Sequence, residues 1–258
     1  MPKQLLIYES AVPMSATRHG SMWFDTVANY SFSAGVNAVP LMAVEFIRAA
    51  TEYAIVFAEA RGDVLPATVL GVRPEQNLFL SDEAKWEAKY IPAFIRRYPF
   101  VFSATNDRNM VTLCIDESHP GLNREGRGQR LFGDDGKPSA YTDQVLKFLK
   151  EYQVHFERTR LFGKRLKELE LLEPMQAKVT TPKGETLTLA GFMTVPRKKL
   201  RDLSRDALAS LAKTDELELL YLHLYSMRNF KDVKDRLIGS MSDGNEPVNA
   251  GAGATSMH

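Results

Sequence analysis

Apolar residues recur every three to four positions along residues 140–171, while charged residues occupy most of the positions between them. This spacing is the period of an α-helix, so the segment is predicted to be one long amphipathic helix. Its apolar stripe consists of Val145, Phe148, Leu149, Tyr152, Phe156, Leu166 and Leu169. We therefore expect the helix to cover a hydrophobic core along most of its length.

Short apolar or alternating segments on both sides of this helix predict strands, because β-branched and aromatic runs bounded by turn residues are typical of strands. The predicted strands are residues 4–8, 54–58, 67–72, 100–105, 110–116, 177–181 and 186–195. Turn-forming residues at 106–109 and 182–185 join two consecutive pairs of these strands. Each pair is therefore expected to form an antiparallel hairpin.

Further helices are predicted between and after the strands, at positions where a capping residue or a proline begins a helical pattern. They are residues 39–47, residues 81–90, a short piece between Pro92 and Pro99, and three helices that start near Arg197, Ser204 and Thr214. Hairpins separated by helices predict an α+β fold: a mainly antiparallel sheet, packed with the long amphipathic helix and a helical C-terminal part.

The domain organisation follows from the same pattern. Residues 1–238 are expected to form one domain, with a subdivision near residue 138 as the alternative. Residues 239–258 are rich in Gly, Ser, Ala and Asn and contain little apolar surface to bury, so they are expected to be a disordered tail.

Composition and charge exclude several classes of protein. The 258 residues are 44% hydrophobic and carry 33 Lys and Arg against 32 Asp and Glu, so the chain has no overall attraction for nucleic acid. No apolar segment approaches the roughly 18 residues that a membrane span needs, and none at the N-terminus has the length of a secretory signal. We therefore expect a cytoplasmic protein, with export to the surface by a route other than Sec as the alternative.

Motifs that bind phosphates, metals or catalytic nucleophiles are absent from the sequence. It contains no GxGxxG, P-loop, HExxH, CxxC or GxSxG pattern, and its histidines share no ligand spacing. We therefore predict neither a metal nor a cofactor and assign no catalytic residue. Cys114 lies in an apolar strand and His223 in an apolar helix, so both are expected to be buried core residues.

The densest group of chemically versatile side chains lies in residues 86–100, where aromatic residues surround two adjacent arginines. Aromatic side chains beside an arginine can line a pocket for a peptide or an aromatic ligand, and a guanidinium matches a carboxylate. The predicted ligand-binding residues are Trp86, Tyr90, Arg97 and Tyr98, with His19 from the N-terminal segment. The alternative is an aromatic core segment in which the arginine is structural.

Glu45 is expected to be partly buried, because the predicted helix 39–47 is apolar on most of its sides. A buried carboxylate without a cation is costly. We therefore predict a structural ion pair between Glu45 and one of the two adjacent arginines, Arg96 or Arg97, with Arg96 as the assigned partner.

Taken together, these landmarks resemble the SapC family of bacterial proteins over about residues 5–230. The residues that carry the resemblance are Val39-Pro40-Leu41 with Glu45-Phe46, Leu70-Gly71 with Asn77-Leu78-Phe79, Trp86, Tyr90-Ile91-Pro92-Ala93, Arg96-Arg97-Tyr98-Pro99-Phe100, Leu131-Phe132 with Gly136, Thr159, Leu171-Leu172, Gly191, and His223 with Ser226. The family is named for a bacterial surface-array (S-layer) locus. It differs from a peptide-transporter permease of the same name, which needs membrane-spanning helices.

The resemblance implies a setting for the protein. Some members of the family are encoded near TonB-dependent outer-membrane receptors and flavin-dependent halogenase-like proteins, which are therefore the suspected partners. We expect a soluble accessory or binding protein that recognises a peptide or a partner protein in an uptake or surface-layer context. The alternatives are an enzyme with an unfamiliar active site, acting on a peptide or an amino-acid side chain, and a surface-layer component.

Overall fold

An antiparallel five-stranded sheet forms the centre of the computed structural model, which describes residues 6–26, 29–60, 62–104 and 111–242. The strand order is β10–β11–β4–β5–β3. The bounds are β3 (Ala38–Pro40), β4 (Ile55–Ala60), β5 (Asp63–Val69), β10 (Glu173–Thr180) and β11 (Thr186–Thr194). The predicted hairpin of residues 177–195 is confirmed as β10 and β11, and the strands predicted at 54–58 and 67–72 pair as β4 and β5.

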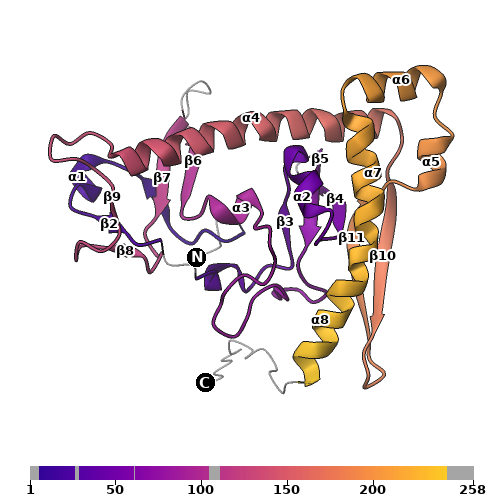
Figure 1. The fold of residues 1–258 in the computed structure, drawn as a ribbon, viewed down its shortest axis with the longest axis horizontal. Coiled ribbons are helices and arrows are strands. Elements are labelled where there is room, and N and C mark those ends of the chain that lie inside the picture. Colours follow the sequence, from indigo (N-terminus) through magenta and orange to yellow (C-terminus); the bar gives the residue numbers. More distant parts are fainter. Residues whose placement is uncertain (1–5, 27–28, 61, 105–110, 243–258) are drawn as a thin grey trace, which may run out of the picture.

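Two three-stranded sheets lie at the other end of the molecule from β10 and β11 (Figure 1). One has the order β1–β7–β6 and the other β8–β2–β9. Their bounds are β1 (Ala11–Pro13), β2 (Trp23–Phe24), β6 (Phe100–Ala104), β7 (Val111–Asp116), β8 (Leu122–Asn123) and β9 (Gln129–Arg130). The strands predicted at 100–105 and 110–116 are therefore confirmed as an antiparallel pair, although their connecting turn lies outside the described residues.

Helix α4 (Ala140–Glu168) runs along one side of the molecule and joins its two ends (Figure 1). It begins at Ser139, whose hydroxyl accepts the Thr142 amide hydrogen, and it confirms the long amphipathic helix. The shorter helices are α1 (Ala16–His19), η1 (Ser31–Ser33), η2 (Ala43–Glu45), α2 (Phe46–Ala49) and α3 (Ala93–Arg96). The C-terminal ones are α5 (Arg197–Arg201), α6 (Arg205–Lys213), α7 (Glu216–Ser226), η3 (Met227–Asn229) and α8 (Phe230–Ser242).

The hydrophobic core has one large cluster and two smaller ones, of which the smallest contains Met42, Ala93 and Tyr152. The large cluster extends from Tyr8 through Phe57 and Phe162 to Leu237, so it joins residues from both ends of the chain. A smaller cluster lies beneath the first half of α4 and contains Phe24, Phe100, Ile115, Leu131, Phe132 and Leu149. The α+β class, with antiparallel sheets and a helical C-terminal part, is confirmed.

The prediction of a helix at residues 81–90 is wrong. This segment consists of turns, with an isolated bridge between Leu80 and Trp86. The carboxylate of Glu52 accepts the amide hydrogens of Lys89 and Tyr90, at 2.6 and 3.1 Å. Contacts with a distant part of the chain therefore replace the local hydrogen bonds that a helix would make.

Other elements also differ from the predictions. Ala38–Pro40 form β3, because they pair with Ala67–Val69, and the helical turns begin only at Ala43. Leu6 and Ile7 lie in a turn, so the strand predicted at 4–8 is wrong where it is described. Helix α8 continues through Ser242, four residues into the expected tail, and residues 243–258 lie outside the described residues.

The backbone of α4 approaches β5 closely at Gly163. A Cβ atom at this position would lie 1.8 Å from the carbonyl oxygen of Val64, so no other residue fits without a shift of backbone. In contrast, a Cβ at Gly239 in α8 would meet nothing within 4 Å. A side chain is therefore excluded at Gly163 by the backbone of β5, whereas Gly239 has room for one.

We expect Gly163→Ala to lower the free energy of unfolding by about 1–3 kcal/mol, because the added methyl overpacks the contact between α4 and β5. Gly239→Ala should raise it by about 0.5–1 kcal/mol, because alanine is the better helix former. Urea unfolding of both variants measures the effect. A loss of stability in both, or in neither, would contradict the close approach.

His223 is a core residue, as predicted, and is fully buried. Its Nδ1 donates to the Ile55 carbonyl at 2.8 Å and its Nε2 accepts the Val195 amide hydrogen at 3.0 Å, so α7 is tied to β4 and to the end of β11. Burial lowers the pKa of His223 to about 4, although the hydrogen bond to Ile55 opposes the shift.

The lowered pKa of His223 predicts a stability that depends on pH. The folded protein holds the imidazole neutral, whereas the unfolded chain takes up a proton below its ordinary pKa of about 6.5. The contribution of His223 is therefore complete above pH 6.5 and falls by about 3 kcal/mol as the pH drops towards 4. NMR titration of the His223 ring should show no protonation above pH 5, and titration near pH 6.5 would contradict its burial.

Candidate functional site

The carboxylate of Glu45 connects η2 with α3. Glu45 is 4% exposed; its Oε2 accepts the Met42 amide hydrogen at 2.7 Å, in the manner of the acidic residue of a capping box. Its Oε1 accepts the Ala93 amide hydrogen at 2.7 Å and the Tyr90 hydroxyl at 2.6 Å. Because Ala93 is the first residue of α3, the carboxylate fixes where this helix begins.

Glu45 and Arg96 are joined through Tyr90 and not by the direct ion pair that the sequence predicted. In the described part of the chain Glu45 pairs with neither Arg96 nor Arg97; the Tyr90 hydroxyl donates to Glu45 and accepts from Arg96 Nη2 at 3.5 Å. Arg96 Nε also donates to the Ile91 carbonyl at 2.9 Å, and its guanidinium lies 5.3 Å from the centre of the Phe148 ring. Arg96 is thus held on the outer side of α3.

The guanidinium of Arg97 lies among aromatic rings. Its central carbon is 4.4 Å from the ring centre of Phe94, 4.7 Å from that of Tyr152 and 5.6 Å from that of Tyr8. Burial raises the pKa of both tyrosines, and the positive charge of Arg97 partly offsets this effect. The Nε of Arg97 is buried without a hydrogen-bond partner, and no carboxylate pairs with its guanidinium among the residues described.

A cavity of about 360 Å³ lies between α3, β2 and the first half of α4. Its aromatic walls are formed by Phe24, Tyr30, Phe32, Tyr98, Phe100, His119, Tyr141 and Phe148. Its other lining residues are Thr26, Asn29, Ile95, Arg96, Arg97, Gln144 and Val145. We call this feature the aromatic cavity. None of its described lining residues is Asp or Glu, so its only formal charges are those of the two arginines.

Tyr98 forms one wall of the aromatic cavity. Its ring stacks on Phe32 with a centre distance of 4.1 Å and meets the His119 ring at 5.3 Å. Burial raises the pKa of Tyr98 to about 12, although a hydrogen bond with Ser118 opposes the shift. Burial also raises the pKa of Tyr141 to about 12, so both phenols keep their protons at neutral pH.

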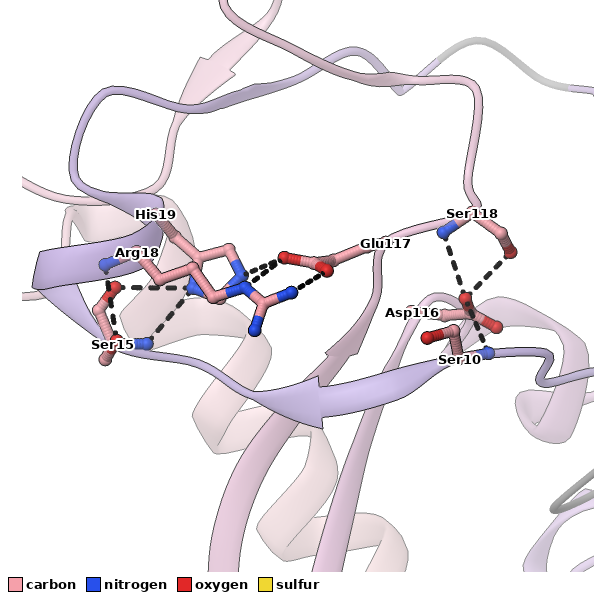
Figure 2. Close-up of polar contacts among 7 residues, drawn as sticks. All are labelled: Ser10, Ser15, Arg18, His19, Asp116, Glu117 and Ser118. Carbon is pink, nitrogen blue, oxygen red and sulfur yellow. Dashed lines mark hydrogen bonds and ion pairs between the residues drawn. The ribbon is translucent and has the colours of Figure 1, made fainter.

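Asp116 fixes the segment that leads into His119. Its buried carboxylate accepts a hydrogen bond from the amide of Glu9. It also accepts hydrogen bonds from the amide of Ser10 and from both the amide and the hydroxyl of Ser118 (Figure 2). Burial alone would raise the pKa of Asp116, but these hydrogen bonds outweigh it and lower the pKa. An ionised Asp116 therefore joins the end of β7 to the N-terminal segment.

His119 is a cavity residue that sequence reasoning missed. Its Nδ1 accepts the Gly121 amide hydrogen at 2.9 Å, so the neutral ring carries its proton on Nε2. Burial lowers the pKa of His119, with Asp116 opposing the shift, and Nε2 has no hydrogen-bond partner in the described part of the chain. No spacing in the sequence marks His119, whereas the structure shows that a Cβ at Gly121 would lie 2.4 Å from the Asp25 carbonyl oxygen and 2.9 Å from the imidazole Cε1.

His19 is placed outside the aromatic cavity. It is fully buried at the end of α1, where its Nδ1 accepts the Ser15 amide hydrogen and its Nε2 lies 3.2 Å from Glu117 Oε1 (Figure 2). Arg18 also binds Glu117, through both Nε and Nη2, and this hydrogen bonding lowers the pKa of Glu117. His19 thus ties α1 to the chain that leaves β7.

The remaining predicted residues divide into two groups. Arg97 and Tyr98 line the aromatic cavity together, as predicted. Trp86 lies behind the wall: its Nε1 donates to the Tyr53 hydroxyl at 2.8 Å, and its ring meets Tyr30 edge-on. Tyr90 does not line the cavity, but its hydroxyl accepts a hydrogen bond from Arg96, which does. Cys114 is buried, as predicted, and burial raises the pKa of its thiol.

Fold and cavity together define an α+β protein with an aromatic cavity flanked by two arginines. A sequence model of the SapC family matches residues 14–233, which is most of the chain. The protein therefore belongs to the SapC family. No curated protein and no solved structure matches it.

Two general features of the described residues bear on the site. No helix among them combines the length and the apolar character needed to cross a membrane. Within the same residues, no three His, Cys, Asp or Glu side chains are grouped so that they could hold a metal ion.

Proposed function

We propose that this SapC protein is a binding protein that recognises a peptide, or a segment of a partner protein, through the aromatic cavity. The observation that supports the proposal is the lining of the cavity, which combines aromatic walls with two arginines and no acidic residue. Ligand sites are typically apolar hollows with a few convergent polar groups. Aromatic and arginine side chains also dominate the energetics of protein recognition.

The polar groups of the aromatic cavity favour binding over proton-transfer catalysis. Arg96 and Arg97 can only donate hydrogen bonds, and His119 presents a protonated Nε2. Tyr98 and Tyr141 keep their protons, because burial raises the pKa of each to about 12. A general base needs a free lone pair near neutral pH, and none of these groups offers one in this arrangement. A set of donors is suited to holding a ligand with negative or acceptor atoms.

The setting that we propose follows from membership of the SapC family. The bound chain would be a peptide in an outer-membrane uptake or surface-layer context, or a segment of a TonB-dependent receptor or a halogenase-like flavoprotein. The cytoplasmic location expected from the sequence belongs to the same proposal.

A matched pair of substitutions on α4 tests whether peptides occupy the aromatic cavity. Gln144 and Gln153 are both exposed on α4, but only Gln144 lines the cavity. Gln144→Trp should lower the affinity for peptides selected from a displayed library at least about tenfold, because the indole obstructs the cavity. Gln153→Trp should leave the affinity unchanged, as isothermal titration calorimetry can measure.

Two outcomes would contradict the proposed function. One is a displayed library from which wild-type protein enriches no peptide. The other is a set of enriched peptides that bind the Gln144→Trp and Gln153→Trp variants as tightly as the wild type.

A further inference from the structure

We propose that the aromatic cavity takes the aromatic residue at the C-terminus of a peptide. The ring of this residue would fill the cavity, and its α-carboxylate would meet Arg96. This inference rests on the proposed function and narrows it from peptides in general to one kind of chain end.

The size of the aromatic cavity limits how much of a peptide can enter. Its volume of about 360 Å³ lies at the small end of the range of ligand pockets, which is roughly 300–1,000 Å³. A cavity of this size is suited to a single large side chain and not to an extended segment. Its aromatic walls select a ring, because rings pack well against other rings in stacked or edge-on arrangements.

The charges of the aromatic cavity favour an anion as the ligand. Arg96 and Arg97 both line it, and no carboxylate pairs with either of them in the part of the chain that the structure describes. Arg97 adds positive charge to the cavity wall, although its guanidinium lies among the rings of Phe94 and Tyr152, which do not line the cavity. Within the described residues, the Arg96 guanidinium donates only to the Ile91 carbonyl and, at 3.5 Å, to the Tyr90 hydroxyl, which leaves donors for a ligand.

Among unmodified peptide residues at neutral pH, only one kind supplies both a ring and a negative charge. An aromatic residue within a chain has no charge, and an aspartate or glutamate within a chain has no ring. An aromatic residue at the C-terminus has both, because its α-carboxylate is free. A free aromatic carboxylic acid shares this chemistry, so the experiment must distinguish the two sources.

The backbone around the aromatic cavity favours a carboxylate over a phosphate. Phosphate sites commonly add free amide hydrogens from a helix N-terminus or a glycine-rich loop. Here the first amide of α3, that of Ala93, is bound by Glu45. In the first turn of α4, Ser139 binds the Thr142 amide, and Asp143 adds a negative charge. The guanidinium groups remain, and their planar fork matches a carboxylate.

His119 distinguishes a peptide from a free acid. Its protonated Nε2 has no partner in the described residues, and its ring lies against Phe24, Phe32 and Tyr98 in the cavity wall. We assign this donor to the last peptide carbonyl of the bound chain. A free aromatic acid such as 3-phenylpropionate lacks that carbonyl and should gain nothing from His119.

The test uses three probes on the full-length protein: N-acetyl-phenylalanine, its C-terminal amide and 3-phenylpropionate. NMR titration should show N-acetyl-phenylalanine binding at least about tenfold more tightly than the amide, and also more tightly than 3-phenylpropionate. Arg96→Gln should remove most of the preference for the acid over the amide. Arg48→Gln is the matched control: Arg48 is exposed and lies over the Tyr90 ring, like Arg96, but does not line the cavity.

Three results would overturn the inference. Equal binding of the acid and the amide would show that the free carboxylate is not recognised. An equal loss in Arg48→Gln and Arg96→Gln would show a general charge effect. Equal binding of 3-phenylpropionate and N-acetyl-phenylalanine would assign the cavity to free aromatic acids. If displayed peptides bind the cavity without a free C-terminus, the proposed function stands and this inference alone fails.

Discussion

The buried carboxylate of Glu45 is the interaction on which the candidate site depends. A buried charge is tolerated only when hydrogen bonds satisfy it, and here the donors come from Met42, Tyr90 and Ala93. Ala43, which follows Met42 and begins η2, donates its amide hydrogen to the Thr159 hydroxyl on α4 at 2.9 Å. The hydrogen bonds of the Glu45 carboxylate therefore position η2 relative to α3. The hydrogen bond between Ala43 and Thr159 positions η2 relative to α4.

The position of α3 determines what the aromatic cavity offers to a ligand. Arg96 is the last residue of α3 and Arg97 follows it, and the Tyr90 hydroxyl bridges the Glu45 carboxylate and the Arg96 guanidinium. Arg97 instead lies among rings, with no carboxylate beside it in the described chain. Glu45 thus organises the site without entering the cavity, and no acidic residue is among the described lining residues of the cavity.

Features encoded by local patterns were predictable from the sequence. The helical period predicted α4, and alternation with turn residues predicted β6 with β7 and β10 with β11. The helix predicted at residues 81–90 does not form, because Glu52 binds the backbone of this segment. The helix predicted at residues 39–47 begins late, because the pairing of β3 with β5 overrides the helical pattern at its start. Both errors come from contacts between residues distant in sequence, which a local pattern does not contain.

The candidate site could be predicted only where it is contiguous. Arg97 and Tyr98 were found because aromatic and arginine residues crowd one segment. Phe24, His119 and Tyr141 come from three separate parts of the chain, and no spacing relates them. His19 was assigned to the site for its aromatic neighbours in sequence, but Ser15 and Glu117 hold it elsewhere.

A double-mutant cycle between Glu45→Gln and Tyr90→Phe tests the central role of the Glu45 carboxylate most directly. Hydrogen bonds to a buried charge contribute about 1.5–3 kcal/mol each, so each single substitution should lower the free energy of urea unfolding by about that amount. Because the two groups share one hydrogen bond, the double variant should lose less than the sum, by about 0.5–3 kcal/mol. Strict additivity, or a negligible loss in Glu45→Gln, would contradict the account.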